Sequence, residues 1–464
     1  MSRSVRRVPA VAALLALALT GTACDTGGRA APVGGSGVGD PYFPKAGNGG
    51  YDVAHYSLAL DYTPATRRLT GTADITARAT RDLSAFDLDL AGLRVDSVRV
   101  EGEEARWSRA GQELTVRPHA GLREGETFRA TVRYSGTPRT LTDPDGSKEG
   151  WLPTADGALA LGEPVGSMAW FPGNHHPSDK ATYDIAITVP QSFEAVSNGE
   201  QTDRTTEDGR TTYRWQTAQP MASYLATVAI GRFRLARTTG PHGLPVVTAV
   251  TPGQAGASAD VLARIPEILD WAEYNFGPYP FSSAGAIVSG PRDAGYALET
   301  QTRPVFPGAP DVSTLVHELV HQWYGDSVGP ASWRDMWLNE GFATYAEWLY
   351  DEDHDGPTAQ ETFTGYYEDG PDDLWAFPPA RPTSAAHISD ASVYQRGAMV
   401  LHKIRQTVGD DTFYDIVQGW AAAHRHGTAD TAGFVRYVEK KAPGKDFRTI
   451  WKDWLYGDGK PGHA

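Results

Sequence analysis

The chain shows two different hydrophobic periods. From residue 51 apolar and polar side chains alternate, most clearly over residues 56–62 and 71–77. Alternation with period two turns one face of a strand toward a core and therefore predicts β-strands. Similar alternation occurs at residues 86–90, 114–116, 128–134, 183–189, 212–216 and 224–230. Many short strands separated by turn residues are typical of a β-sandwich, so we expect a β-sandwich-like N-terminal domain over residues 51–239.

Beyond residue 250 apolar residues recur every three or four positions, which is the period of an amphipathic helix. Residues 259–274 predict one such helix despite Pro266, and short apolar pairs at 287–288 and 297–298 predict strand pieces. From residue 313 helices dominate, at 313–324, 338–351, 393–407, 411–423, 430–441 and 446–456. We therefore expect a second, mostly helical domain over residues 240–460.

The N-terminus has the features of an export signal. Three arginines precede an apolar run over residues 8–19 that is too short to span a membrane permanently. Small residues then lead to Cys24, the only cysteine of the chain. This order resembles a bacterial lipoprotein signal, and it predicts a signal peptide over residues 1–23 and lipid on Cys24. Plain secretion with cleavage nearby is the alternative.

Residues 24–50 are rich in Gly, Ala and Pro and predict a flexible linker between the lipid anchor and the folded part. No other apolar run reaches spanning length, so the lipid on Cys24 is the expected contact with the membrane. The protein is then an extracytoplasmic membrane lipoprotein, or a secreted protein in the alternative. The net charge of −15 argues against a nucleic-acid partner.

The candidate chemistry lies in His317-Glu318-Leu319-Val320-His321. Residues four apart share one face of a helix, so His317 and His321 can bind one metal ion. Zinc favours such nitrogen donors, and a catalytic zinc site has three protein ligands and one open position. Glu340, nineteen positions after His321, is the natural third ligand. Glu318 is placed to act on a water molecule at the metal.

The surrounding residues support this interpretation. Asp311 and the hydroxyl residues after it are candidate N-caps of a helix through the motif, and Gly325 is a stop signal. A second helix is predicted around Glu340, close enough in the chain to fold back on the first. The alternative, an amphipathic helix with ordinary polar histidines, leaves Glu318 and Glu340 unexplained.

The segment 337–343 reads Trp-Leu-Asn-Glu-Gly-Phe-Ala. Together with the histidine motif it resembles the aminopeptidase N family of zinc metallopeptidases, peptidase family M1, which includes leukotriene A-4 hydrolase. The resemblance runs in the same order from about residue 51 to residue 455. It implies a β-sandwich-like domain followed by a thermolysin-like catalytic domain over residues 240–460. It also implies one Zn²⁺ per chain and peptide substrates with a free N-terminus.

The resemblance implies further site residues. Residues 296–300 match a family motif that reads Gly-Ala-Met-Glu-Asn, of which Glu299 is kept but the first Gly, the Met and the Asn are not. The family uses this glutamate to hold the substrate amine, and a looser match points to Glu163 as its partner. Residues 393–398 resemble the segment with a catalytic tyrosine, here Tyr394, whose phenol can stabilise an oxyanion.

These residues predict a zinc-dependent aminopeptidase that releases the N-terminal residue of a peptide. Metal-bound histidines need an acceptor on their second nitrogen, for which Asn339 and Glu347 are candidates. One alternative is a zinc endopeptidase or another zinc hydrolase of the same fold, and Glu299 discriminates against it. The other is a catalytically silent cell-surface lipoprotein that binds a partner. Two histidines at 175–176 lie in a Pro/Gly-rich stretch and are interpreted as loop residues, not as a second metal site.

Overall fold

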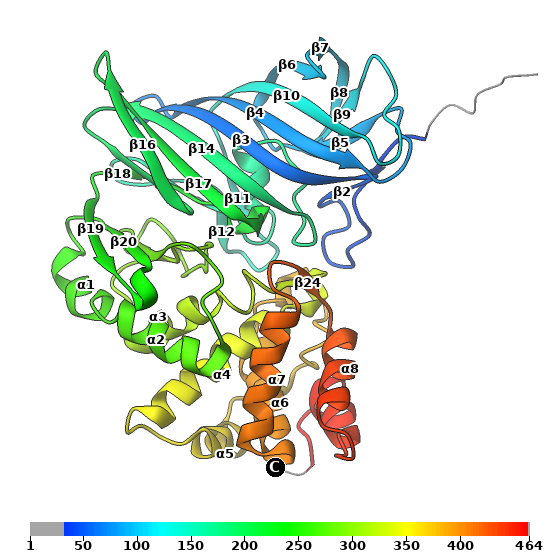
Figure 1. The fold of residues 1–464 in the computed structure, drawn as a ribbon, viewed down its shortest axis with the longest axis vertical. Helices are drawn as coiled ribbons and strands as arrows, with labels where there is room; N and C mark the ends of the chain where they lie inside the picture. Colours follow the sequence, from blue (N-terminus) through cyan, green and yellow to red (C-terminus); the bar gives the residue numbers. More distant parts are fainter. Residues whose placement is uncertain (1–31, 463–464) are drawn as a thin grey trace, which may run out of the picture.

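A computed structural model describes residues 32–462 of the chain. It has a β-rich part, drawn at the top of Figure 1, and a mostly helical part below it. The predicted signal peptide, Cys24 and the first residues of the predicted linker lie outside the described residues. Within the described range, no helix combines the length and the apolar character that a membrane crossing requires.

The β-rich part is built on an eight-stranded sheet with the order β16-β17-β14-β3-β4-β10-β6-β7. All neighbours run antiparallel except β14 and β3, which are parallel. The strands are β3 (Tyr51–Thr63), β4 (Arg68–Ala79), β6 (Arg94–Val100), β7 (Glu103–Glu104), β10 (Thr127–Gly136), β14 (Lys180–Pro190), β16 (Glu200–Glu207) and β17 (Arg210–Ala222).

Two smaller sheets cover one face of the large sheet, with the orders β11-β12-β13-β18-β15 and β5-β9-β8. The ring of Tyr62 on β3 lies 5.1 Å from Trp151 of one small sheet, and Tyr51 lies 5.6 Å from Phe86 of the other. The predicted sandwich is therefore present. The strands are β5 (Phe86–Asp89), β8 (Arg106–Ala110), β9 (Glu113–Arg117), β11 (Thr140–Thr142), β12 (Lys148–Pro153), β13 (Ala158–Leu161), β15 (Glu194–Ser197) and β18 (Val228–Gly231).

Strand β3 shows why the alternation in the sequence predicted this part well. Its side chains from Tyr56 to Tyr62 are buried at every second position, with at most 2% of each buried side chain exposed. The register shifts between Val53 and His55, which is the signature of a β-bulge. Because the bulge adds one residue, Tyr51 and Tyr56 both face the core although five positions separate them.

The segment over residues 32–50 is docked on the fold. It forms β1 (Gly35–Ser36) and β2 (Asn48–Gly49), and Asp40 is 4% exposed. The Asp40 carboxylate accepts hydrogen bonds from the Ser332 hydroxyl at 2.7 Å and the Trp333 backbone N–H at 3.0 Å. The prediction of a flexible linker is wrong for these residues. The hydrogen bonds of the buried Asp40 carboxylate hold the segment on the fold, although its Gly, Ala and Pro content favours flexibility.

The helical part begins with a four-stranded sheet in the order β19-β20-β21-β22. The domain boundary predicted after residue 239 falls inside this sheet, since the first strand pairs with the second. A two-stranded pair, β23 with β24, lies near the interface with the β-rich part (Figure 1). The strands are β19 (Arg234–Thr239), β20 (Pro245–Val250), β21 (Ala284–Val288), β22 (Val305–Phe306), β23 (Gly329–Pro330) and β24 (Thr428–Ala429).

Eight α-helices are described in this part, and seven shorter helical turns connect elements across the whole described chain. The α-helices are α1 (Ala255–Leu262), α2 (Ile265–Phe276), α3 (Val312–Val320), α4 (Trp337–Asp353), α5 (Ala359–Asp369), α6 (Ala391–Val408), α7 (Asp410–Ala423) and α8 (Thr431–Lys441). The shorter turns are η1 (Gly166–Ala169), η2 (Ser223–Leu225), η3 (Pro241–Gly243), η4 (Trp333–Asp335), η5 (Asp372–Trp375), η6 (Ala385–His387) and the π-helical η7 (Ile450–Leu455).

Two helix predictions differ from the structure. The single helix over residues 259–274 is wrong, because α1 ends at Leu262 and Pro266 lies in the first turn of α2. Proline lacks the N–H that a continuous helix would need, but it is tolerated where a new helix starts. Helix α5 was missed, although Thr358 and Glu361 form a capping box that marks its start in the sequence.

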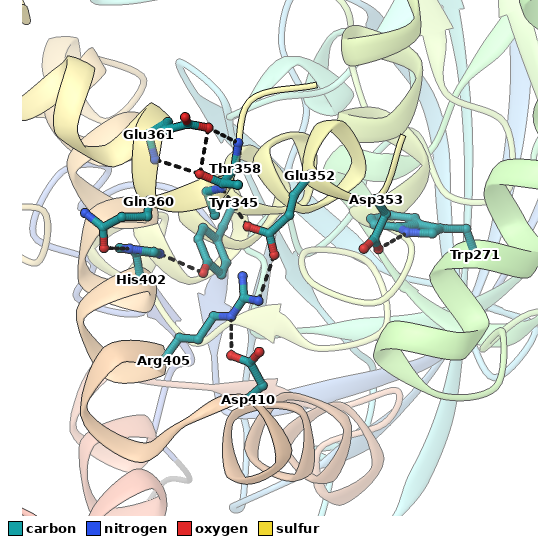
Figure 2. Close-up of polar contacts among 11 residues, drawn as sticks. Trp271, Tyr345, Glu352, Asp353, Thr358, Gln360, Glu361, His402, Arg405 and Asp410 are labelled. Atoms are coloured by element: carbon teal, nitrogen blue, oxygen red, sulfur yellow. Dashed lines mark hydrogen bonds and ion pairs between the residues drawn. The ribbon is translucent and has the colours of Figure 1, made fainter. Parts of the chain in front are cut away.

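Polar side chains connect α4, α5, α6 and the start of α7 (Figure 2). Arg405 on α6 donates to Glu352 of α4 at 2.7 Å and to Asp410 at 2.8 Å. The His402 ring on the same helix contacts the Tyr345 hydroxyl at 3.0 Å and is only 4% exposed. Burial, with the nearby Arg405 cation, lowers the pKa of His402 to about 4.

Acid should therefore destabilise the fold through His402. The unfolded chain takes up a proton near pH 6.5, whereas the folded chain keeps a neutral ring down to about pH 4. The shift from 6.5 to about 4 corresponds to a loss of about 3 kcal/mol of unfolding free energy over that range. In urea titrations at pH 7 and pH 4.5, His402→Gln should show a smaller loss than the wild type. Equal losses would contradict this account.

Helices α4 and α6 cross with two glycines in contact. A Cβ added to Gly341 would lie 2.9 Å from the backbone carbon of Gly397, and one added to Gly397 would lie 3.0 Å from the Gly341 Cα. Gly341 follows Glu340, and Gly397 is three positions after Tyr394. The close crossing therefore sets how these two side chains approach each other.

Gly341→Ala should consequently push the two helices apart. We expect a loss of about 1–2 kcal/mol of stability, because overpacking outweighs the gain in helix propensity, together with a fall in activity. Gly365→Ala on α5 is the matched control, since nothing lies within 4 Å of its added Cβ, and it should be neutral or stabilising. Thermal unfolding of both variants distinguishes the two cases. Equal effects would show that the crossing is not tight.

Candidate metal centre and active site

Helix α3 presents the two histidines. The Asp311 carboxylate caps the helix by accepting from the Thr314 backbone N–H at 2.8 Å, as its position in the sequence predicted. The helix ends at Val320, and His321 is its C-cap, with a backbone N–H that still donates to the His317 carbonyl at 3.2 Å. The two imidazoles therefore stay one helical turn apart on the same side, with ring centroids separated by 4.7 Å.

Helix α4 brings Glu340 to this pair. Its Oε2 atom lies 3.2 Å from His317 Nε2 and 3.3 Å from His321 Nε2, and the three donor atoms lie within 4.8 Å of one another. Two ligand atoms each about 2.0–2.1 Å from a tetrahedral zinc ion lie roughly 3.3 Å apart. The donor set and its spacing therefore fit Zn²⁺, and the three predicted ligands meet at one point.

The remaining imidazole nitrogens both have acceptors. Glu347, two turns along α4 from Glu340, places Oε1 2.7 Å from His317 Nδ1, and the Ser313 hydroxyl holds its other oxygen at 2.5 Å. His321 Nδ1 donates to the Tyr324 backbone carbonyl at 3.0 Å. Such partners fix the orientation of a ligand ring. The expectation for Glu347 is met. That for Asn339 is not, because its amide contacts Met336 instead of a histidine.

Glu347→Ala should weaken zinc binding by about 10- to 100-fold, because His317 would lose the acceptor that orients its ring. Competition with a chromophoric chelator measures this affinity directly. Ser313→Ala removes only the hydroxyl that holds the second Glu347 oxygen, so its effect should be smaller. Unchanged zinc affinity in Glu347→Ala would contradict a positioning role for this carboxylate.

The centre is strongly charged and largely buried. Burial opposes the charged form of Glu340, but the two imidazoles outweigh it and lower the pKa of Glu340 to about 2. Burial likewise opposes the cation of His321, and Glu340 and Glu299 outweigh it and raise the pKa of His321 to about 9. A bound Zn²⁺ displaces these protons, because it takes up neutral imidazole. Glu318 is 6% exposed, and burial raises its pKa to about 8.

Glu299 and Glu163 reach the same centre from two other segments. One carboxylate oxygen of each is buried without a hydrogen-bond partner among the described residues. Carboxylate oxygens of both lie within 4.8 Å of one another and of one from Glu340. Burial raises the pKa of both side chains, and the neighbouring carboxylates add to the effect at Glu163. Both predicted residues are therefore placed where a cation would relieve their repulsion.

Residue Gln322, directly after the second histidine, holds the Glu299 segment in place. Its side chain donates to the Glu299 carbonyl at 3.2 Å and accepts from the Thr302 backbone N–H at 2.7 Å. Asn198 of the β-rich part donates to the Gln301 carbonyl at 2.8 Å. The segment is thus fixed from both parts of the molecule. Sequence reasoning missed Gln322, and its position beside the motif was the available signal.

Tyr394 enters from α6. Its ring lies parallel to that of His317, with an interplanar angle of 8° and centroids 5.9 Å apart. Burial, with the charge of Glu340 next, raises the pKa of Tyr394 well above its ordinary value. The phenol therefore keeps its proton at neutral pH and can act as a hydrogen-bond donor.

The three metal ligands, Glu318, Glu299, Glu163 and Tyr394 line one cavity of about 590 Å³. The hairpin between β11 and β12 also contributes to its wall. Its lining comprises Asp143, Asp145, Gly146, Ser147, Lys148, Glu163, Pro164, Gly295, Tyr296, Ala297, Glu299, His317, Glu318, His321, Glu340, Ser389 and Tyr394. The hairpin residues were not predicted. A turn pattern marks them in the sequence, but nothing in the sequence alone places them beside the metal ligands.

The histidines at 175–176 have structural roles. His175 is buried, with one ring nitrogen 3.0 Å from the Ser223 hydroxyl and the other 3.0 Å from the Phe171 carbonyl. His176 contacts Asp40 and the Ser178 hydroxyl. All four ring nitrogens therefore have partners within the protein, and the two histidines lie in a loop, as predicted.

Comparison with known proteins gives the family. Residues 53–225 match the peptidase M1 N-terminal domain, and residues 309–454 match the peptidase family M1 domain. The solved structure of an M1 zinc metallopeptidase from Deinococcus radiodurans, a variant bound to the substrate Tyr-Ser-Ala, superposes with a TM-score of 0.85. It is 31% identical, and the match covers 92% of this chain and 99% of that one. The chain belongs to peptidase family M1.

Curated relatives in this family are longer. The M1 chain is 25% identical to probable aminopeptidase 2 of Sulfurisphaera tokodaii over 81% of its own length and 50% of the relative. It is 25% identical to glutamyl aminopeptidase of Rattus norvegicus over 86% of its own length and 46% of the relative. The chain thus spans about half the length of these relatives. Zinc is the metal of the family's solved relatives, in agreement with the donor set of His317, His321 and Glu340.

Proposed function

We propose that this M1 chain is a zinc-dependent aminopeptidase that releases the N-terminal residue of peptides. The observation that carries the proposal is that Glu299 and Glu163 each place one buried, unpartnered carboxylate oxygen beside the metal ligands. The names of the curated relatives and the tripeptide bound in the Deinococcus radiodurans structure support it.

The three ligands, His317, His321 and Glu340, hold the metal. When bound, Zn²⁺ supplies Lewis acidity to a substrate carbonyl and to water. The Glu318 carboxylate accepts the proton of the attacking water and passes it to the leaving amine. Burial raises the pKa of Glu318 to about 8 in the metal-free protein, so this group binds a proton readily at neutral pH.

The two carboxylates of Glu299 and Glu163 bind the α-ammonium group of the substrate. A cation between them neutralises their mutual repulsion and supplies the missing hydrogen bonds. A peptide with a blocked amine cannot do so and leaves both groups unpaired, which costs binding free energy. The position of these residues relative to the metal therefore selects the first peptide bond.

Tyr394 stabilises the negative charge that develops on the carbonyl oxygen during attack. Its protonated phenol lines the cavity and lies parallel to the ring of His317. A donor that is fixed before the reaction costs no reorganisation when the charge develops.

Metal analysis and hydrolysis test this proposal together. The purified chain should contain one zinc per molecule and release the fluorophore from aminoacyl amides. A chelator should abolish the release, and added Zn²⁺ should restore it. A protein that binds no zinc, or that holds one zinc and is inert on a panel of aminoacyl amides, would overturn the proposal.

We also propose that the chain acts outside the cytoplasm, anchored by lipid on Cys24 at the end of a cleaved signal peptide. The support is the N-terminal sequence alone: three arginines, the apolar run at residues 8–19 and the single cysteine. Labelling with a fatty-acid analogue in a bacterial host should modify the wild type but not Cys24→Ser. Export without labelling would favour the secreted alternative.

A further inference from the structure

An acidic hairpin forms one wall of the cavity and has no part in the mechanism above. Its turn is fixed by the backbone, since Asp143 N–H donates to the Ser147 carbonyl at 3.0 Å and Gly146 N–H donates to the Asp143 carbonyl at 2.9 Å. Asp143, Asp145 and Lys148 of this hairpin all line the cavity that contains the metal ligands.

Asp143 is 7% exposed, and its Oδ1 atom is buried without a hydrogen-bond partner among the described residues. Lys148 of the same hairpin forms no ion pair with Asp143 in the described part of the chain, and its Nζ donates to the Thr142 hydroxyl at 2.5 Å. Burial, with the charge of Asp145 next, raises the pKa of Asp143 to about 7. A buried carboxylate without a partner costs free energy, and such groups mark sites that a ligand completes.

Each of the four glutamates that line the cavity already has a proposed task. Glu340 holds the metal, Glu318 moves a proton, and the pair at 299 and 163 holds the α-ammonium. Asp143 lines the same cavity as both members of this last pair. With the amine held by that pair, the side chain of the first substrate residue is the part of the substrate that is left to meet Asp143.

We propose that Asp143 binds the cationic side chain of an N-terminal lysine or arginine, so that basic first residues are preferred and acidic ones are disfavoured. This inference rests on the proposed aminopeptidase function and adds the substrate class. Lysine is the sharper probe, since methionine has a similar unbranched shape without the charge. A buried carboxylate discriminates by pairing with the cation and by repelling a second carboxylate.

Fluorogenic amides of lysine, methionine, leucine and glutamate test the inference with the zinc-loaded chain. The wild type should show a kcat/KM for lysine at least about tenfold above that for methionine, with glutamate lowest. Asp143→Asn preserves the shape and breaks no side-chain hydrogen bond, and it should lower the lysine-to-methionine ratio about tenfold. Asp208→Asn removes the same charge from an exposed turn between β16 and β17, away from the cavity lining, and should change the ratio by less than about threefold.

The possible outcomes distinguish a failure of the role proposed for Asp143 from a failure of the proposed aminopeptidase function. If methionine and leucine amides are cleaved but lysine is not preferred, Asp143 has no such role and the aminopeptidase function still stands. The same conclusion follows if Asp143→Asn leaves the ratio unchanged while its zinc content and thermal unfolding match the wild type. If no amide is cleaved by a chain with full zinc, the proposed function itself fails.

Discussion

Exchanging Glu318 for glutamine should lower kcat by about 10³-fold or more while zinc content stays at one per chain. Glutamine preserves the shape of the side chain but cannot accept the proton from water. Glu318 is not among the three metal ligands, so the metal should remain bound. Steady-state rates on a fluorogenic amide, together with metal analysis of the same preparation, measure both quantities.

The control is Glu368→Gln, an exposed position on α5 that should leave kcat unchanged. If the Glu318→Gln variant keeps more than a tenth of the wild-type rate, Glu318 is not the general base. Loss of zinc in the variant would instead assign Glu318 to the metal site.

Glu299→Gln should lower kcat/KM for substrates with a free amine by about 10²-fold or more, again with zinc retained. Glu299 is 2% exposed and has one unpartnered oxygen, and in the proposed function the substrate ammonium is the partner of this oxygen. Removing the charge therefore costs most of the recognition of the N-terminus and leaves the metal geometry unchanged.

The matched comparison for Glu299→Gln uses N-acetylated versions of the same peptides. The wild type should cleave only the free-amine form, and the variant should lose most of this discrimination because its activity on the free form falls. Equal loss of zinc and activity would indicate a structural role for Glu299. Unchanged kcat/KM would place amine recognition elsewhere in the cavity.

The sequence predicted those parts of the fold in which local pattern and tertiary environment agree. In β3 the apolar residues face one core, so alternation was sufficient. In α3 the cap at Asp311 and the spacing of the histidines were local features, and both are present. Where one residue outweighs its neighbours, prediction failed: Pro266 divides a helix, and Asp40 fixes a segment that its composition marked as flexible.

The site residues, too, could be predicted from the sequence where local features determine their position. His317, His321 and Glu340 could be predicted from spacing, because the helices that carry them, α3 and α4, follow one another in the chain with only residues 321–336 between them. Glu299 and Glu163 depended on a resemblance, because nothing local in the sequence brings their segments to the metal. Asp143 was missed, since its place in the cavity depends on how a hairpin of the β-rich part packs against the helical part.

The most direct test of the central claim is to incubate the zinc-loaded chain with one peptide in two forms, free and acetylated at the N-terminus, and to follow the products by mass spectrometry. We predict stepwise loss of single residues from the free peptide and no cleavage of the acetylated form. Cleavage of both forms at equal rates, or at an internal bond, would contradict an aminopeptidase in which Glu299 and Glu163 bind the free amine and thereby select the first peptide bond.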